Sequence, residues 1–325
     1  MQRTSITRLV GLALVPAVVL GGLAACGDDD SDDSSGSDTI SVVASFYPVA
    51  EAAERVGGDR VDVENLTPAG TEPHDLELTP DQVADLEDAD VVLYVGEGFQ
   101  PAVSEIAERR DEASFDLLEE IPLESGASEA LEAQEAAEEG AAEEEGHEES
   151  GLDPHFWLDP QLLIEAVHEV EAALSDASPD DADTFRANAQ EYEDDLTALD
   201  EELAAGLESC ERDEIVTSHA AFHYLAQRYG LTQLPITGLS PEAEPDPERL
   251  ADLADQIEAE GITTVFYETL VSPDVAETLA REVDVDAAVL NPIEGLTEDQ
   301  NVAGDDYSVL MRDNLAALQA ALGCS

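Results

Sequence analysis

The chain has 325 residues, enough for two domains of ordinary size, each with its own core. It carries 78 acidic residues against 12 arginines and no lysine, which gives a formal net charge of -66. Such a surface excludes nucleic acid as a partner, because phosphate binding needs clustered Lys and Arg. It attracts cations in general, but a proteome-wide acidic bias would give the same composition, so the charge assigns no cation site.

The N-terminus has the pattern of an export signal. Basic residues precede a short apolar run, residues 9–23, which lacks the length and flanks of a membrane-spanning helix. The run ends in Leu-Ala-Ala-Cys at Cys26, which resembles the bacterial lipobox. We therefore expect a signal peptide over residues 1–25, a lipidated Cys26 and a flexible tether over residues 26–38. A secreted form without lipid is the alternative.

Strand and helix patterns alternate in the next part of the chain. Apolar, mostly β-branched runs bounded by turn residues predict strands at residues 40–46, 61–66 and 91–95. Pro48 suits the first turn of a helix, and Thr79-Pro80 predicts an N-cap and a helix to about residue 88. This alternation is typical of βαβ units with a mostly parallel sheet.

Residues 124–150 interrupt this pattern. The segment is rich in Glu, Ala and Gly, and it lacks the large apolar groups whose burial offsets the entropy of ordering. We expect a disordered or loosely helical loop. Asp159-Pro160 and Ser178-Pro179 then introduce two helical stretches, to about residues 176 and 207, which predict a long connector.

The last third of the chain repeats the alternation. Strands are predicted at residues 214–217, 231–236, 262–267 and 285–290, and helices follow Asp246-Pro247, Ser272-Pro273 and residue 305. We expect an α/β fold with two lobes, each a mostly parallel sheet flanked by helices, bridged by a long helix. The expected boundaries are residues 39–176 for the N-terminal lobe, 177–209 for the connecting helix and 210–325 for the C-terminal lobe.

Two cysteines remain if Cys26 carries lipid. Cys210 and Cys324 then form an even pair in an oxidising compartment. We expect a disulfide that ties the start of the C-terminal lobe to the chain end.

Unusual polar residues lie just past the predicted strands. They are His74 after the second strand, His155 in the loop 153–160, His219 after the strand 214–217, and Glu294 after the last strand. Ligands of open α/β sheets bind beyond the carboxyl ends of strands. Three imidazoles and one carboxylate suit a tetrahedral borderline ion, whereas Ca²⁺ and Mg²⁺ prefer oxygen cages. Because the spacing forms no local zinc motif, scattered structural histidines remain an alternative.

Several motifs in order resemble the zinc- and manganese-binding proteins of bacterial ABC importers, the cluster A-I or ZnuA-like family. They are residues 70–80, 153–160, 218–222, 229–231 and 290–297, and the resemblance covers about residues 40–322. It implies two α/β lobes bridged by a long helix, with a metal in the interlobe cleft. It also implies that His74, His155, His219 and a late acidic residue are the ligands, and that a permease and an ATPase are the partners.

The resemblance also bears on the metal and on the fourth ligand. Family members with His at the third position look like zinc binders and those with a carboxylate look like manganese binders, so His219 favours Zn²⁺ over Mn²⁺. Glu294 lies in a motif that resembles three-His-one-Glu members. Glu268, after the strand 262–267, and a water are the alternatives.

Other histidines and aromatics receive structural interpretations. His147 is the one histidine of the acidic loop, which is either a solvated spacer or a weak collector of Zn²⁺. We interpret His223 as a surface residue or a support to the site, and His168 as a solvated or packed residue. Phe156 and Trp157 are expected to pack and hold the loop of His155.

Together these features predict an exported, lipid-anchored protein that binds Zn²⁺ and delivers it to an ABC importer. The alternatives are a manganese-binding member of the same family and a metal-binding surface adhesin. We expect no enzyme activity, because four protein ligands leave no position for a catalytic water and no hydrolase motif occurs. We expect a monomer.

Overall fold

The computed structural model describes residues 39–96, 98–110, 113–121 and 152–325. The expected signal peptide, Cys26, the tether and the acidic segment 124–150 with His147 lie outside the described residues. Among the described helices, none combines the length and the apolar content that a transmembrane span requires.

The first sheet has four parallel strands in the order β2-β1-β3-β4. They are β1 (Ile40–Ala44), β2 (Val61–Asn65), β3 (Val91–Tyr94) and β4 (Ser114–Asp116). Successive side chains of β1 and β3 enter different cores: Val42 packs in the cluster with the long helices, and Val43 in the cluster with α2 (Pro80–Asp88) and α3 (Pro101–Ala107). Helices therefore cover both faces, which explains why the two central strands are almost wholly apolar.

The second sheet repeats this topology, with four parallel strands in the order β6-β5-β7-β8. They are β5 (Glu214–Thr217), β6 (Thr232–Pro235), β7 (Thr264–Tyr267) and β8 (Asp286–Val289). The helices of this half are α8 (His223–Tyr229), α9 (Pro247–Glu260), α10 (Asp274–Glu282), α11 (Glu298–Ala303) and α12 (Tyr307–Leu322). Two parallel sheets flanked by helices confirm the predicted α/β class.

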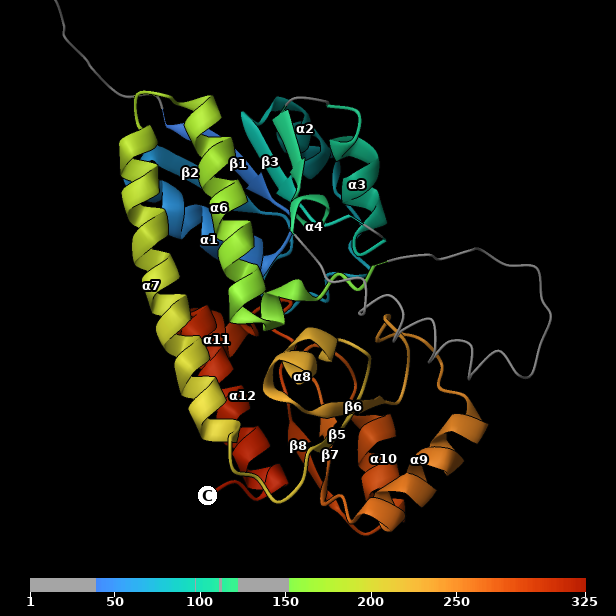
Figure 1. Cartoon of the computed structure of the whole chain (residues 1–325). Helices are drawn as coiled ribbons and strands as arrows, with labels where there is room; N and C mark the ends of the chain where they lie inside the picture. The colour runs from blue at the N-terminus through green and yellow to red at the C-terminus, as the bar shows by residue number, and fades with distance from the viewer. Residues whose placement is uncertain (1–38, 97, 111–112, 122–151) are drawn as a thin grey trace, which may run out of the picture. The chain divides into compact units, whose positions relative to one another are not determined.

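Two long helices connect the last strand of the first sheet to the first strand of the second sheet, and they lie side by side (Figure 1). They are α6 (Pro160–Ala177) and α7 (Ala182–Leu207). The buried positions of α7 recur every three or four residues, as expected for one helix face: Phe185, Ala189, Tyr192, Leu196, Leu199, Leu203 and Leu207. Through this face α7 contacts α1 (Tyr47–Gly57) in the first half and α12 in the second. The division at residues 177 and 209 stays a prediction.

Helix caps explain where most helices begin. Thr79 forms a capping box with Gln82, and the side chains of Asp159 and Asp246 accept backbone N–H groups at the starts of α6 and α9. At α10 the expected N-cap is displaced by one residue: Pro273 holds the cap position, and Ser272 accepts a hydrogen bond from the Asp274 N–H.

The sequence did not predict four short elements. They are α3, β4, α4 (Leu117–Glu120) and α11. α3 has no side-chain cap and β4 pairs on one side with three residues, so neither has a strong local pattern. α11 does have one, because Thr297 and Gln300 form a capping box.

The predicted disulfide between Cys210 and Cys324 is present. It joins the turn after α7 to the chain end after α12. Backbone N–H groups of Glu211 and Arg212 both donate to Leu322 O beside it. The ends of these two helices are therefore fixed to each other by covalent and hydrogen bonds.

Candidate metal centre

Four residues that are far apart in the sequence meet at the carboxyl ends of the strands. His74 follows β2, His219 lies two residues after β5, and Glu294 follows β8. His155 lies immediately before a short 3₁₀ turn, Phe156–Leu158, that leads into α6. These are the residues that the sequence singled out, and the structure brings all four together.

The nearest nitrogen or oxygen atoms of the four side chains lie within 4.8 Å of one another. Glu294 Oε1 is 3.2 Å from His155 Nε2, 3.3 Å from His219 Nε2 and 3.6 Å from His74 Nε2. The Nε2 atoms of His155 and His219 are 3.3 Å apart. A tetrahedral zinc shell with its usual bond lengths has edges of about 3.3 Å. These four separations thus lie close to the edge length of a four-coordinate zinc shell.

Burial makes this arrangement costly without an ion. His155 and His219 are fully buried, and Glu294 is 2% exposed. Among the described residues, His74 Nε2 and Glu294 Oε1 are buried atoms that have no hydrogen-bond partner. Unpaired buried polar atoms lose their hydration with nothing in return, and a cation at the centre would satisfy both.

Two carboxylates orient the buried imidazoles. Asp153 Oδ1 lies 2.7 Å from His155 Nδ1, and Glu268 Oε1 lies 2.6 Å from His219 Nδ1. Each contact engages one ring nitrogen and leaves Nε2 facing the group, as in carboxylate–histidine–metal arrangements. Glu268 was the alternative fourth ligand. In the structure its carboxylate contacts Nδ1 of His219, the ring nitrogen that lies outside the group of four. No role was predicted for Asp153, although a carboxylate two residues before a candidate histidine ligand is a recognisable signal.

The charges in the site shift its pKa values in opposite directions. Burial lowers the pKa of His155 and His219, but Asp153 and Glu268 outweigh it and both pKa values are raised. Burial raises the pKa of Glu294, but the three imidazoles beside it outweigh burial and hold that pKa well below its usual range. For His74, burial dominates and lowers the pKa. Without a cation, protonated imidazoles neutralise the carboxylates.

The backbone before Glu294 is strained. Ile293 has φ 57°, in the left-handed region that a β-branched residue rarely adopts. Its N–H donates to Asn291 Oδ1, and the Asn291 backbone exchanges hydrogen bonds with the Asn314 side chain at 2.8 and 2.7 Å. Such strain persists where surrounding contacts hold it, and here it lies directly before the candidate donor Glu294.

Two further histidines stay outside the group. His168 is exposed on α6, where its Nε2 lies 3.3 Å from Glu193, as a solvated residue would. His223 begins α8 and is partly buried, without a place among the four. Phe156 and Trp157 are buried to 1% and 0% exposure, which confirms the predicted packing role beside His155.

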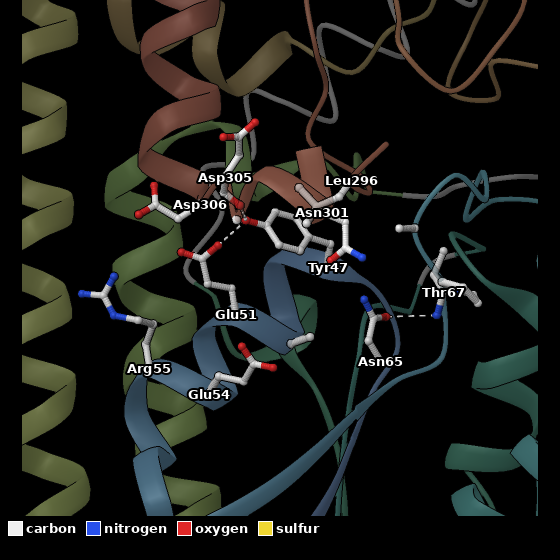
Figure 2. Close-up of a pocket in the computed structure, with 14 residues that line it drawn as sticks. Tyr47, Glu51, Glu54, Arg55, Asn65, Thr67, Leu296, Asn301, Asp305 and Asp306 are labelled. Atoms are coloured by element: carbon white, nitrogen blue, oxygen red, sulfur yellow. Dashed lines mark hydrogen bonds between the residues drawn. The ribbon is translucent and has the colours of Figure 1, made fainter. Parts of the chain in front are cut away.

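A separate cavity of about 490 Å³ lies beside α1 and contains none of the four residues. Tyr47 and Glu51 line it, and the Tyr47 hydroxyl donates to the Glu51 carboxylate (Figure 2). Glu51 also accepts the Tyr307 backbone N–H at 2.9 Å. The buried carboxylate of this cavity is therefore already paired, unlike Glu294 Oε1.

Comparison with known proteins decides the family. The family model described as zinc-uptake complex component A, periplasmic (ZnuA) matches residues 42–321. The chain belongs to the ZnuA family. This confirms the resemblance seen in the sequence.

Relatives and solved structures agree with this assignment. The zinc-binding lipoprotein AdcA of Streptococcus pneumoniae (strain TIGR4) is 38% identical over 297 residues, which cover 91% of this chain and 58% of AdcA. The chain thus spans a little over half the length of that relative. The high-affinity zinc uptake system protein ZnuA of Bacillus subtilis (strain 168) is 35% identical over 96% of this chain and 97% of its own length. The Zn(II)-bound ZnuA-like domain of S. pneumoniae AdcA has a TM-score of 0.71 at 36% identity, covering 87% and 99% of the two chains.

Proposed function

We propose that this ZnuA-family protein is an extracytoplasmic solute-binding protein that binds Zn²⁺ through His74, His155, His219 and Glu294 and delivers it to an ABC importer. The observation that carries the proposal is the group of four donors, whose ligand atoms lie within 4.8 Å of one another with little exposure to solvent. Four protein donors complete the shell and leave no position for a catalytic water, which favours a carrier over a hydrolase.

Zinc is favoured over manganese by the donors themselves. Imidazole suits Zn²⁺, whereas Mn²⁺ prefers oxygen ligands and six-coordinate geometry. Three of the four donors are imidazole nitrogens. The names of the relatives, zinc-binding lipoprotein and high-affinity zinc uptake protein, support the same ion.

The cellular setting follows from the family and from the N-terminal sequence. The family description, periplasmic component of a zinc-uptake complex, supports a permease and an ATPase subunit as partners. The lipobox-like ending at Cys26 and the lipoprotein name of AdcA support a lipid anchor on the outer face of the cell membrane. The division into two lobes with a connecting helix, given above, is part of the same proposal.

The test is native mass spectrometry of the protein offered Zn²⁺ and Mn²⁺ together. We expect one retained zinc per chain and no retained manganese. Retention of manganese in preference to zinc, or of no metal at all, contradicts the proposal. A His155→Ala variant measured beside the wild type assigns the bound ion to this group, because it is expected to lose the ion.

A further inference from the structure

We propose that Tyr224, Trp157 and Tyr307 form an aromatic clamp that fixes His155 and Glu294 at four-coordinate spacing before the metal ion arrives. The inference rests on the proposed zinc site and adds residues that set its geometry. None of the three belongs to the group of four donors. They are positioning residues, and they act through the main chain of the segments that carry the ligands.

Two tyrosines hold the segment of His155 on both sides. The Tyr224 hydroxyl, from α8, donates to Asp153 O at 2.9 Å, two residues before His155. The Tyr307 hydroxyl, from the first position of α12, donates to Trp157 O at 2.5 Å, two residues after His155. Both tyrosines belong to the second half of the chain. They therefore fix a segment of the first half against the elements that carry His219 and Glu294.

Trp157 makes the reciprocal contact. Its indole N–H donates to Pro292 O at 2.8 Å, two residues before Glu294. The ring is fully buried, and its centroid lies 4.7 Å from that of Phe46 and 5.3 Å from that of Phe99. A ring packed this tightly has one available orientation, so the N–H holds the carbonyl at a fixed position.

The three contacts share a chemistry that suits positioning. Each is a side-chain donor on a main-chain carbonyl, so it fixes the course of a segment and leaves the ligand atoms free for the ion. The resulting separation of His155 Nε2 and Glu294 Oε1 is 3.2 Å. Donors held in place before the ion arrives need no rearrangement to bind it, and three imidazoles among the four donors favour a borderline ion such as Zn²⁺.

The test compares two tyrosines of one helix. Tyr224→Phe removes the hydroxyl that bonds Asp153 O, and Tyr229→Phe removes a hydroxyl that bonds Asp200 Oδ1 at the same 2.9 Å. Zinc affinity is measured by competition with a chromophoric chelator, and Co²⁺ is then loaded as a probe of geometry. The intense visible absorption of four-coordinate Co²⁺ reports the coordination number, which a general loss of stability does not change.

We expect Tyr224→Phe to weaken zinc binding roughly 10-fold, the lower range for outer partners of metal ligands. The Co²⁺ band should weaken in the same variant, and Tyr229→Phe should match the wild type in both measurements. Trp157→Phe, which keeps a ring and loses the N–H, is expected to follow Tyr224→Phe.

Wild-type affinity and an unchanged Co²⁺ band in Tyr224→Phe and Trp157→Phe would overturn the clamp, and so would equal losses in Tyr229→Phe. Should the wild-type protein itself bind no zinc, the proposed function fails rather than the clamp alone.

Discussion

The two ligand-bearing segments of the first half are held in different ways. His155 is fully buried, its ring is bonded to Asp153, and its segment is tied to the second half on both sides. His74 keeps 10% of its side-chain surface exposed. Its segment is joined to the second half by a main-chain hydrogen bond, in which Gly70 N–H donates to Leu296 O at 2.7 Å. His155, with His219 and Glu294, therefore forms the more tightly held part of the site, here called the frame, and His74 completes the group.

Removal of a ligand from the frame should have the largest effect. We expect His155→Ala to weaken zinc binding by more than about 100-fold, beyond the range for outer partners. His74→Ala should lose less, because a water can complete the shell at the more exposed corner. Competition titrations of both variants measure the two losses. An equal or larger loss in His74→Ala would show that the frame is not the stronger part.

The carboxylates behind the rings should come next. Asp153→Asn and Glu268→Gln are each expected to weaken zinc binding roughly 10- to 100-fold, because they lose the charge that orients a buried ring. Glu72→Gln is the matched control near His74, since Glu72 accepts the His74 and Asp75 backbone N–H groups and an amide oxygen can also do so. The same titrations compare the three variants. If Glu72→Gln weakens zinc binding as much as Asp153→Asn and Glu268→Gln do, the frame and the His74 segment do not differ in the way described.

Protons should compete with zinc at the frame rather than at His74. The folded-state pKa values of His155 and His219 are raised above 6.5, and that of His74 is lowered. The charged rings therefore stabilise the metal-free fold below pH 6.5, and this contribution is lost as pH rises through the raised pKa values. Zinc needs neutral rings, so its affinity should rise over the same window.

Calorimetry in two buffers of different ionisation enthalpy measures the protons that zinc displaces. We expect about one to two per ion near neutral pH. The number of displaced protons should fall in His155→Ala and change less in His74→Ala. An unchanged number in His155→Ala, or an equal fall in His74→Ala, would contradict competition at the frame.

The smallest effect on binding should come from the disulfide. Cys210 and Cys324 have a sequence separation of 114, and neither belongs to the group of four donors. Replacing both with Ser should lower Tm by roughly 5–15 °C through lost loop-closure entropy. Zinc affinity at 25 °C should stay at the wild-type value. Differential scanning calorimetry and the same competition titration check both parts, and a large loss of affinity would mean that this end of the fold also shapes the frame.

The sequence predicted most elements of the fold and the four donors that meet in the structure, but not the roles of the carboxylates behind the histidine rings. Asp159-Pro160 and Thr79-Pro80 marked helix starts correctly, because caps and proline act within one turn. Glu268 and Glu294 could not be told apart by position, because each follows one of two neighbouring strands, β7 and β8, whose ends share one edge. Their roles depend on where each side chain ends: the Glu268 carboxylate contacts Nδ1 of His219, whereas Glu294 joins the group of four.

The aromatic clamp could not be predicted from the sequence either. Tyr224 and Tyr307 bond main-chain carbonyls of residues 71 and 150 positions away, and a carbonyl acceptor has no residue type to recognise. Short edge elements such as β4 were missed for a related reason, since three residues carry too little periodicity.

The central claim is a single zinc held by His74, His155, His219 and Glu294. Crystals of the zinc-loaded protein, with diffraction measured on both sides of the zinc absorption edge, test it most directly. We predict one anomalous peak per chain at about 2.0–2.1 Å from three Nε2 atoms and one Glu294 oxygen. A peak at another place, or none among these four side chains, would contradict the account.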